Sequence, residues 1–174
     1  SMSWIQNYPF ALVAEFLRAM RPNLFIHQFW HIPFPPPDIL RLLPSGSHEA
    51  LLRGLLGNDL MEFQIDRHAL NFLDCVAEFV PDAEVDLGDQ TVRIQDRTVQ
   101  VSAFPISIDF EKYHQMAISP QAERLTQTLR TRYAHGSRQL GVSVDRVDYT
   151  KGIPERLRAL ELLWSEHPEM LGRF

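Results

Sequence analysis

Three features are scarce in this chain of 174 residues, and each scarcity argues against a class of protein. Cysteine occurs once, as Cys75, so neither an internal disulfide nor a cysteine-based zinc site can form. Positive charge is in the minority, with 17 Lys and Arg against 22 Asp and Glu and a net charge of −5. This balance argues against nucleic acid or an anionic membrane as the main partner. No apolar run reaches the roughly 20 residues of a membrane span.

The remaining composition is that of an ordinary globular protein, with 45% apolar and 22% charged residues. The length suffices for one domain with a real core. A single thiol and the absence of a signal-peptide pattern predict a reducing, cytoplasmic setting. Both ends look abrupt, because a strand pattern begins at once and the last residues stop where another strand is expected. We therefore expect a piece of a longer protein.

Strand and helix patterns alternate along the chain. Strands are predicted at 4–6, 24–30, 59–64 and 99–103, with further short strands and tight turns inside 84–104. Helices are predicted near 10–20, 38–42, 48–56, 66–79 (with Asp66 as its N-cap) and 120–133. This alternation predicts an α/β fold with a mainly parallel sheet. Ligands bind such sheets at the carboxyl ends of the strands.

Two cations, Arg146 and Lys151, lie in a glycine-containing loop near the end of the chain. A predicted strand over 140–144 leads into the loop, and a predicted helix from 153 leads out. A guanidinium fork and an ammonium point charge together suit a diphosphate, and a helix N-terminus adds unpaired N–H groups. The alternative is a surface loop in which Arg146 pairs with Asp145 or Asp148.

Two further clusters follow predicted strands. His31 ends the strand at 24–30 and could donate a hydrogen bond to a sugar hydroxyl or to a developing charge. It could equally be a core histidine bonded to the backbone. Asn7 and Tyr8 follow the first strand as a polar site or as a simple turn into the helix, which Asn and Pro favour. Neither His31 nor His27, four residues earlier, has a partner at metal-binding spacing.

Taken together, the clusters and their surroundings resemble one family. The chain resembles a segment of a retaining glycosyltransferase of the trehalose-6-phosphate synthase type, a group that includes the glucosylglycerol-phosphate synthases. The matching stretches occur in the family's order and spacing: FWHIPFPPPDI (29–39), LLRGLLGNDLMEFQ (51–64), NFLDC (71–75), AFPISID (103–109) and DRVDYTKGIPERL (145–157).

The resemblance implies the GT-B architecture, in which two Rossmann-like domains, each a parallel sheet with flanking helices, enclose a cleft. Residues 1–136 would be the later part of the acceptor-side domain, and residues 137–174 would begin the donor-side domain. The fold would therefore be incomplete in this segment. The family's glycine-containing loop would lie before residue 1 and its acidic donor-binding segment after residue 174, so the segment alone is predicted to be inactive.

The resemblance also implies roles for the candidate residues. Arg146 and Lys151 would bind the diphosphate of a nucleotide sugar, UDP-glucose in most of the family, and His31 would contact the transferred glucose; all three are expected to be catalytic. Asn7 and Tyr8 would lie on the acceptor side, where glucose 6-phosphate would give trehalose 6-phosphate. The family works without a metal ion or another cofactor, so the protein's task would be positioning and charge stabilisation.

One departure from the family leaves alternatives open. The family pattern Asp-Tyr-His is replaced here by Asn7-Tyr8-Pro9, which keeps hydrogen-bonding capacity but removes a charge. The acceptor could therefore be glycerol 3-phosphate, as in a glucosylglycerol-phosphate synthase. The segment could also belong to a non-catalytic relative that acts as a binding module. A dinucleotide-binding dehydrogenase is disfavoured, since no G-x-G-x-x-G follows a strand.

Overall fold

A computed structural model describes residues 1–134 and 139–173. The chain divides into two compact units, Ser1–Ser107 and Ile108–Phe174, and each is described by itself. The predicted domain boundary between residues 136 and 137 lies outside the described residues, so it stays a prediction. Among the described helices, none has the length and apolar character needed to cross a membrane.

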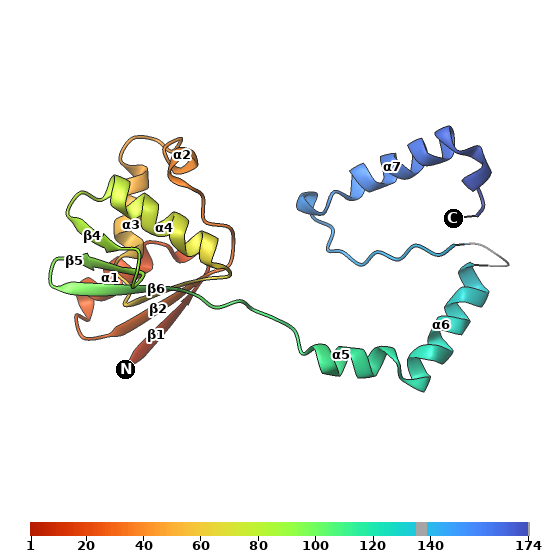
Figure 1. Ribbon diagram of the computed structural model, residues 1–174, viewed down its shortest axis with the longest axis horizontal. Helices are drawn as coiled ribbons and strands as arrows, with labels where there is room; N and C mark the ends of the chain where they lie inside the picture. Colours follow the sequence, from red (N-terminus) through yellow and green to blue (C-terminus); the bar gives the residue numbers. More distant parts are fainter. Residues whose placement is uncertain (135–138, 174) are drawn as a thin grey trace. The chain divides into compact units, whose positions relative to one another are not determined.

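The first unit is built on a six-stranded sheet with the strand order β1-β2-β3-β6-β5-β4 (Figure 1). The four strands β1, β2, β3 and β6 run parallel to one another, and β5 and β4 extend the sheet from β6 as an antiparallel meander. Their bounds are Met2–Gln6, Phe25–Trp30, Leu60–Phe63, Ala83–Asp86, Thr91–Ile94 and Arg97–Ala103 for β1 to β6. The expected α/β fold with a mostly parallel sheet is confirmed, as are the short strands within 84–104.

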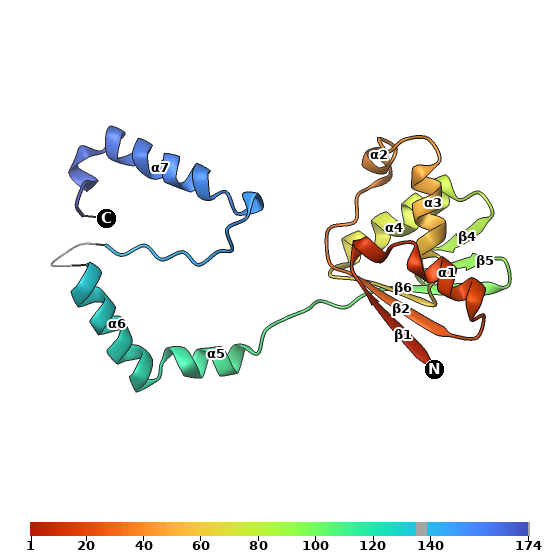
Figure 2. The same ribbon diagram turned by 180° about the vertical axis from the view of Figure 1, so that it is seen from behind.

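Helices join the parallel strands, as the alternating pattern predicts. They are η1 Tyr8–Phe10, α1 Val13–Met20, α2 Pro37–Leu40, α3 Ser47–Leu55 and α4 Asp66–Phe79. The helix expected over 10–20 is divided into η1 and α1. Gly54 and Gly57 allow close contact between α1 and the end of α3, because a Cβ at Gly57 would lie 2.5 Å from the Glu15 nitrogen. The two helices lie beside each other in Figure 2.

The prediction that Asp66 caps α4 is wrong. Ile65 is the last residue with an extended backbone, at φ −145° and ψ 155°, so it occupies the N-cap, and no side chain caps this helix end. Asp66 already lies in the first turn. Its carboxylate is still well placed there, because negative charge near a helix N-terminus is favourable.

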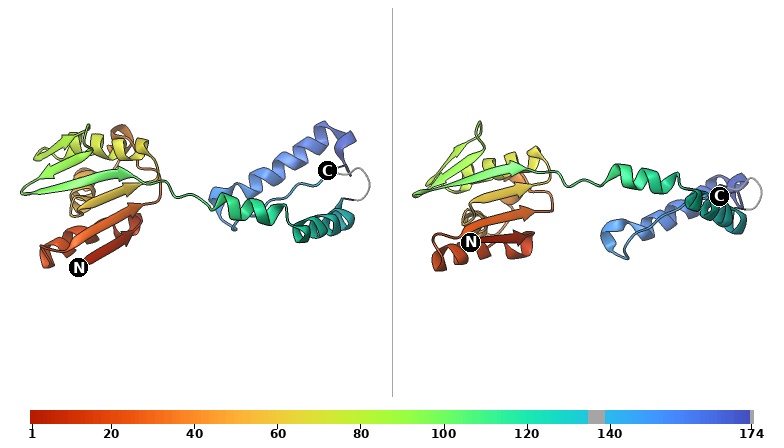
Figure 3. Two further views of the ribbon diagram at one scale, coloured as in Figure 1. Left: turned by 60° about the horizontal axis from the view of Figure 1, so that its bottom comes forward. Right: turned by 90° about the horizontal axis from the view of Figure 1, so that it is seen from below.

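The core of the first unit lies on one face of the sheet, against α1, α3 and α4. In the cross-strand register, Ile5, Gln28, Met61 and Val101 stand side by side in one buried row. The three apolar members of this row are what a buried parallel sheet requires. Gln28 is the exception, since it is a fully buried polar side chain. The strands can be followed from two further sides in Figure 3.

Cys75 is buried in α4, and we expect it to be chemically inert in the folded protein. Burial, with smaller effects from Asp74 and Glu78, raises the pKa of its thiol to about 12. The thiolate is the reactive form, so at about pH 8 the native protein offers on the order of a thousandfold less of it than an unfolded chain. Iodoacetamide labelling followed by mass spectrometry should modify Cys75 in urea but not in the native protein. Rapid labelling of the native protein would contradict this placement.

The second unit is helical in its described residues. It contains α5 Phe110–Ala117, α6 Pro120–Tyr133, η2 Tyr149–Lys151, α7 Ile153–Glu166 and η3 Pro168–Met170. The helix predicted over 120–133 is confirmed at both ends, and Ser119 Oγ caps it by accepting from Ala122 N–H at 3.2 Å. The sequence reasoning missed α5, although Asp109 caps it by accepting from Lys112 N–H at 3.0 Å.

The prediction of a strand over residues 140–144 is wrong. The segment carries no strand, and Val142 and Val144 are 80% and 91% exposed. A strand is stable only when a neighbour satisfies its backbone N–H and C=O groups. Residues 108–134 and 139–173 contain no strand at all, so the backbone of residues 140–144 has no neighbouring strand to pair with.

Candidate active site

The first group of predicted site residues gathers at the carboxyl edge of the parallel strands. Asn7 follows β1 and His31 follows β2, and these two strands are neighbours. Asn7 N–H donates to the carbonyl of Phe29 at 2.8 Å, and the ring of Tyr8 lies 6.4 Å from that of Trp30. The structure therefore brings Asn7, Tyr8 and His31 to one edge of the sheet.

Asn7 has an unusual backbone. Its φ of 67° and ψ of 176° fall in a region that residues with a Cβ rarely adopt. Its side-chain oxygen Oδ1 is buried and has no hydrogen-bond partner among the described residues. A buried acceptor without a donor is costly. Such strained, unsatisfied positions are typical of binding sites.

His31 is held by a neighbour that the sequence reasoning missed. Its Nε2 atom lies 2.5 Å from Oε1 of Gln6, the last residue of β1. An amide oxygen can only accept, so His31 Nε2 carries the proton in this arrangement. The imidazole also packs on Phe29, with ring centroids 4.6 Å apart. The only sequence signal for Gln6 is its position directly before the Asn7-Tyr8 cluster.

The second group, Arg146 and Lys151, lies in the loop before α7. Two carboxylates of this loop bind other partners. Asp145 Oδ2 accepts from Arg156 Nη2 at 2.8 Å and from Ser143 Oγ at 2.8 Å. Asp148 Oδ1 accepts from the backbone N–H and the hydroxyl of Thr150, both at 2.9 Å.

These bonds bear on the alternative in which Arg146 is a paired surface charge. Neither Arg146 nor Lys151 forms a side-chain hydrogen bond or ion pair within the described part of the chain. The hydrogen bond from Arg156 is the main cause that lowers the pKa of Asp145, and the backbone N–H of Thr150 is the main cause that lowers the pKa of Asp148. Both carboxylates therefore stay ionised at neutral pH and keep the loop in place.

Gly152 turns the chain from this loop into α7. Its φ of 60° and ψ of 33° are left-handed, which glycine adopts without the penalty that a Cβ brings. It ends η2 and is also the N-cap of the 14-residue helix α7, with a proline in the first turn. Lys151 thus lies directly before a helix N-terminus, whose free N–H groups and dipole favour an anion.

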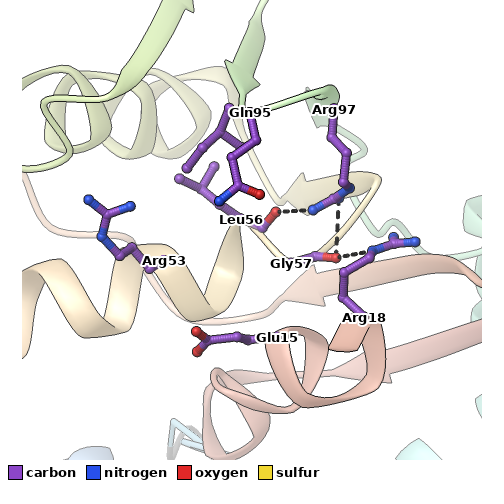
Figure 4. A pocket seen from close by; sticks show the side chains of 8 residues that line it. Glu15, Arg18, Arg53, Leu56, Gly57, Gln95 and Arg97 are labelled. Atoms are coloured by element: carbon purple, nitrogen blue, oxygen red, sulfur yellow. Dashed lines mark hydrogen bonds between the residues drawn. The ribbon is translucent and has the colours of Figure 1, made fainter. Parts of the chain in front are cut away.

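The first unit also contains a separate pocket of about 240 Å³, whose arginines bind backbone carbonyls of the same unit (Figure 4). Arg18 and Arg97 flank it, and both donate to the carbonyl of Gly57, at 3.2 and 3.3 Å. Arg97 also donates to the carbonyls of Leu56 and Asn58, at 3.1 and 2.6 Å. These carbonyls follow α3, so Arg97 satisfies the free acceptors beyond a helix C-terminus.

This role predicts the effect of replacing Arg97. Arg97→Met removes three charge-assisted hydrogen bonds to the backbone after α3 and should lower the free energy of unfolding by about 2 kcal/mol. Urea unfolding measures the change. The matched control is Arg93→Met, since Arg93 is 67% exposed and its one ion-pair partner among the described residues is Glu84, and it should change stability little. Equal effects of the two variants would refute the capping role.

The described residues hold no cluster of three or more side chains of the kinds that bind metal ions. Asn7, Tyr8 and His31 offer hydrogen bonds, and Arg146 and Lys151 offer positive charge. Asn7, Tyr8 and His31 belong to the first unit, and Arg146 and Lys151 belong to the second.

Known proteins resemble this chain over nearly its whole length. A family model described as Glycosyltransferase family 20 matches residues 1–174. The chain is 38% identical to alpha,alpha-trehalose-phosphate synthase [UDP-forming] 2 of Aspergillus niger, over 98% of this chain and 35% of the relative. It is 39% identical to the trehalose-6-phosphate synthase of Mycobacterium ulcerans, over 94% of this chain and 33% of the relative.

Solved structures agree with this relationship. The alpha,alpha-trehalose 6-phosphate synthase of Burkholderia multivorans matches with a TM-score of 0.80 and 33% identity, over 99% of this chain and 35% of that one. The E. coli protein bound with UDP-2-fluoro glucose matches with a TM-score of 0.75 and 30% identity, over 99% of this chain and 37% of that one. The chain thus spans about a third of the length of these relatives. It belongs to glycosyltransferase family 20, the family of the trehalose-6-phosphate synthases, and represents part of a GT-B fold.

Proposed function

We propose that the protein containing this chain is a retaining glucosyltransferase. It moves glucose from a nucleotide sugar, UDP-glucose, to a phosphorylated acceptor such as glucose 6-phosphate, and the product is trehalose 6-phosphate. The observation that carries the proposal is the loop before α7. Its carboxylates are engaged by Arg156 and Thr150, so the charges of Arg146 and Lys151 remain available in the loop that leads to the N-terminus of α7. Two such cations suit a diphosphate leaving group.

The proposed roles follow from the chemistry of each side chain. Arg146 and Lys151 bind the donor diphosphate and stabilise the negative charge that grows on it as the glycosidic bond breaks. His31, with its Nε2 proton directed to Gln6, contacts the transferred glucose. Asn7 and Tyr8 orient the acceptor. The relatives whose names include "UDP-forming" support UDP as the leaving group.

A second acceptor is favoured by one observation. Asn7 stands where the family pattern has a charged aspartate, and its Oδ1 atom is a buried acceptor without a partner among the described residues. The amide keeps hydrogen-bonding capacity but removes a charge from the acceptor side, so glucosylglycerol phosphate is the alternative product. A non-catalytic relative that only binds nucleotide sugar is the third possibility, and it is a different class of function.

The test uses the full-length protein with UDP-glucose and other nucleotide-glucose donors, offering glucose 6-phosphate or glycerol 3-phosphate in separate reactions. Mass spectrometry of the products distinguishes trehalose 6-phosphate from glucosylglycerol phosphate. Binding of UDP without any transfer would identify a binding module. Neither transfer nor nucleotide binding would refute the proposed function. The isolated 174-residue chain is expected to show no turnover.

A further inference from the structure

A buried polar chain lies directly beneath Asn7. Gln28 is fully buried in the middle of β2, and its register neighbours Ile5 and Met61 are apolar. Its carboxamide nitrogen Nε2 donates to the carbonyl of Asn7 at 3.1 Å. Its oxygen Oε1 accepts from Nδ2 of Asn58, also fully buried, at 3.0 Å. These hydrogen bonds therefore connect the loop after α3, through Gln28 in β2, to the acceptor-side candidate Asn7.

A glutamine in an apolar row needs an explanation. Burying a carboxamide costs free energy unless both ends are hydrogen-bonded, and a leucine or methionine would fill the same space without that cost. Gln28 is bonded at both ends, and one of its partners is the residue with the strained backbone. Asn7 is thus held twice, because its N–H donates to Phe29 and its carbonyl accepts from Gln28.

We propose that Gln28 and Asn58 are positioning residues for the acceptor subsite, an inference that rests on the proposed function for its catalytic part. Asn58 orients the carboxamide of Gln28. Gln28 then keeps Asn7 in its disfavoured conformation, and the backbone of Asn7 sets where the side chains of Asn7 and Tyr8 stand. Strain of this kind persists only where the surrounding structure over-determines it, and two buried amides supply that constraint here.

The kinetic test uses the full-length protein with Gln28→Met, which keeps the volume and removes both hydrogen bonds. The KM for glucose 6-phosphate should rise about tenfold, the upper range for loss of one such bond, while the dissociation constant of UDP changes less than about twofold. The matched control is Gln100→Met. Gln100 is an exposed glutamine of the same sheet that bonds to the carbonyls of Asp89 and Gln90, and its replacement should leave the acceptor KM unchanged.

A double-mutant comparison separates positioning from general damage. Glycine adopts the Asn7 backbone conformation without strain, so Asn7→Gly makes the bond from Gln28 unnecessary. In an Asn7→Gly background, Gln28→Met should therefore raise the acceptor KM by less than about threefold. An equal tenfold rise in both backgrounds would overturn the proposal, as would a folded Gln28→Met protein with an unchanged acceptor KM.

A measurement that needs no catalysis tests the role of Gln28 independently of the proposed function. In hydrogen exchange, the amide of Asn7 should lose about tenfold of its protection in Gln28→Met, while the amides of β3 keep theirs. If the wild-type protein transfers no glucose, the proposed function fails but this result still decides the role of Gln28. If Gln28→Met does not fold, the double variant Gln28→Met/Asn58→Leu removes both amides together and is measured in its place. Retained protection at Asn7 in either variant would refute the inference.

Discussion

Replacing Lys151 with alanine should reduce glucosyl transfer by the full-length protein about 10²- to 10³-fold, with weaker binding of UDP. Losing one well-placed group that stabilises a developing negative charge costs about 3–4 kcal/mol. Lys151 has no ion-pair partner within the described residues that would compete for this role, and it lies directly before the N-terminus of α7. Steady-state kinetics with UDP-glucose and calorimetric titration with UDP measure the two effects.

The chain offers a matched control for this substitution. Its other lysine, Lys112, is exposed in α5, so Lys112→Ala should leave both transfer and UDP binding within about twofold of wild type. Lys151→Ala should also leave the thermal unfolding temperature nearly unchanged, since the side chain is exposed. Unaltered UDP affinity and transfer in a folded Lys151→Ala protein would show that the diphosphate is bound elsewhere.

Replacing Phe34 with alanine should produce the largest loss of stability, about 3–5 kcal/mol. Phe34 is 1% exposed, and its ring meets those of Trp30, Phe63 and Phe72 edge-on at 5.4, 5.7 and 5.3 Å. Deleting it leaves a cavity among three aromatic rings. Since folded proteins have only about 5–15 kcal/mol of stability, the variant should unfold at much lower urea concentration.

Tryptophan fluorescence during urea unfolding measures this change, because Trp30 contacts Phe34 directly. The control is Phe16→Ala in the same unit, where the ring is 64% exposed and its loss should cost well under 1 kcal/mol. Similar unfolding midpoints for the two variants would mean that Phe34 is not part of the core. The result also matters for the site, since Phe34 belongs to the stretch that follows His31.

Local patterns predicted most elements of this chain. The signal for α6 is complete within a few residues, with Ser119 as N-cap and Pro120 in the first turn, and the structure confirms both ends. The positions of Asn7 and His31 at one sheet edge also follow from sequence, because parallel strands place their carboxyl ends together. The expected strand at 140–144 failed because strand formation depends on a partner and not on alternation alone.

The sequence by itself determined the family resemblance, the order of strands and helices, and the cations of the loop before α7. Only the tertiary structure decided which side chains meet. In sequence, Gln28 and its neighbour His27 are simply two polar residues in an otherwise apolar strand. The bonds of Gln28 to Asn7 and Asn58 depend on the register between segments that are distant in sequence. Likewise, only the structure shows that Arg156 binds Asp145 and that Thr150 binds Asp148. These contacts leave Arg146 and Lys151 unpaired within the described residues. Hydrogen bonds of this kind are set by three-dimensional proximity, which a local sequence pattern does not encode.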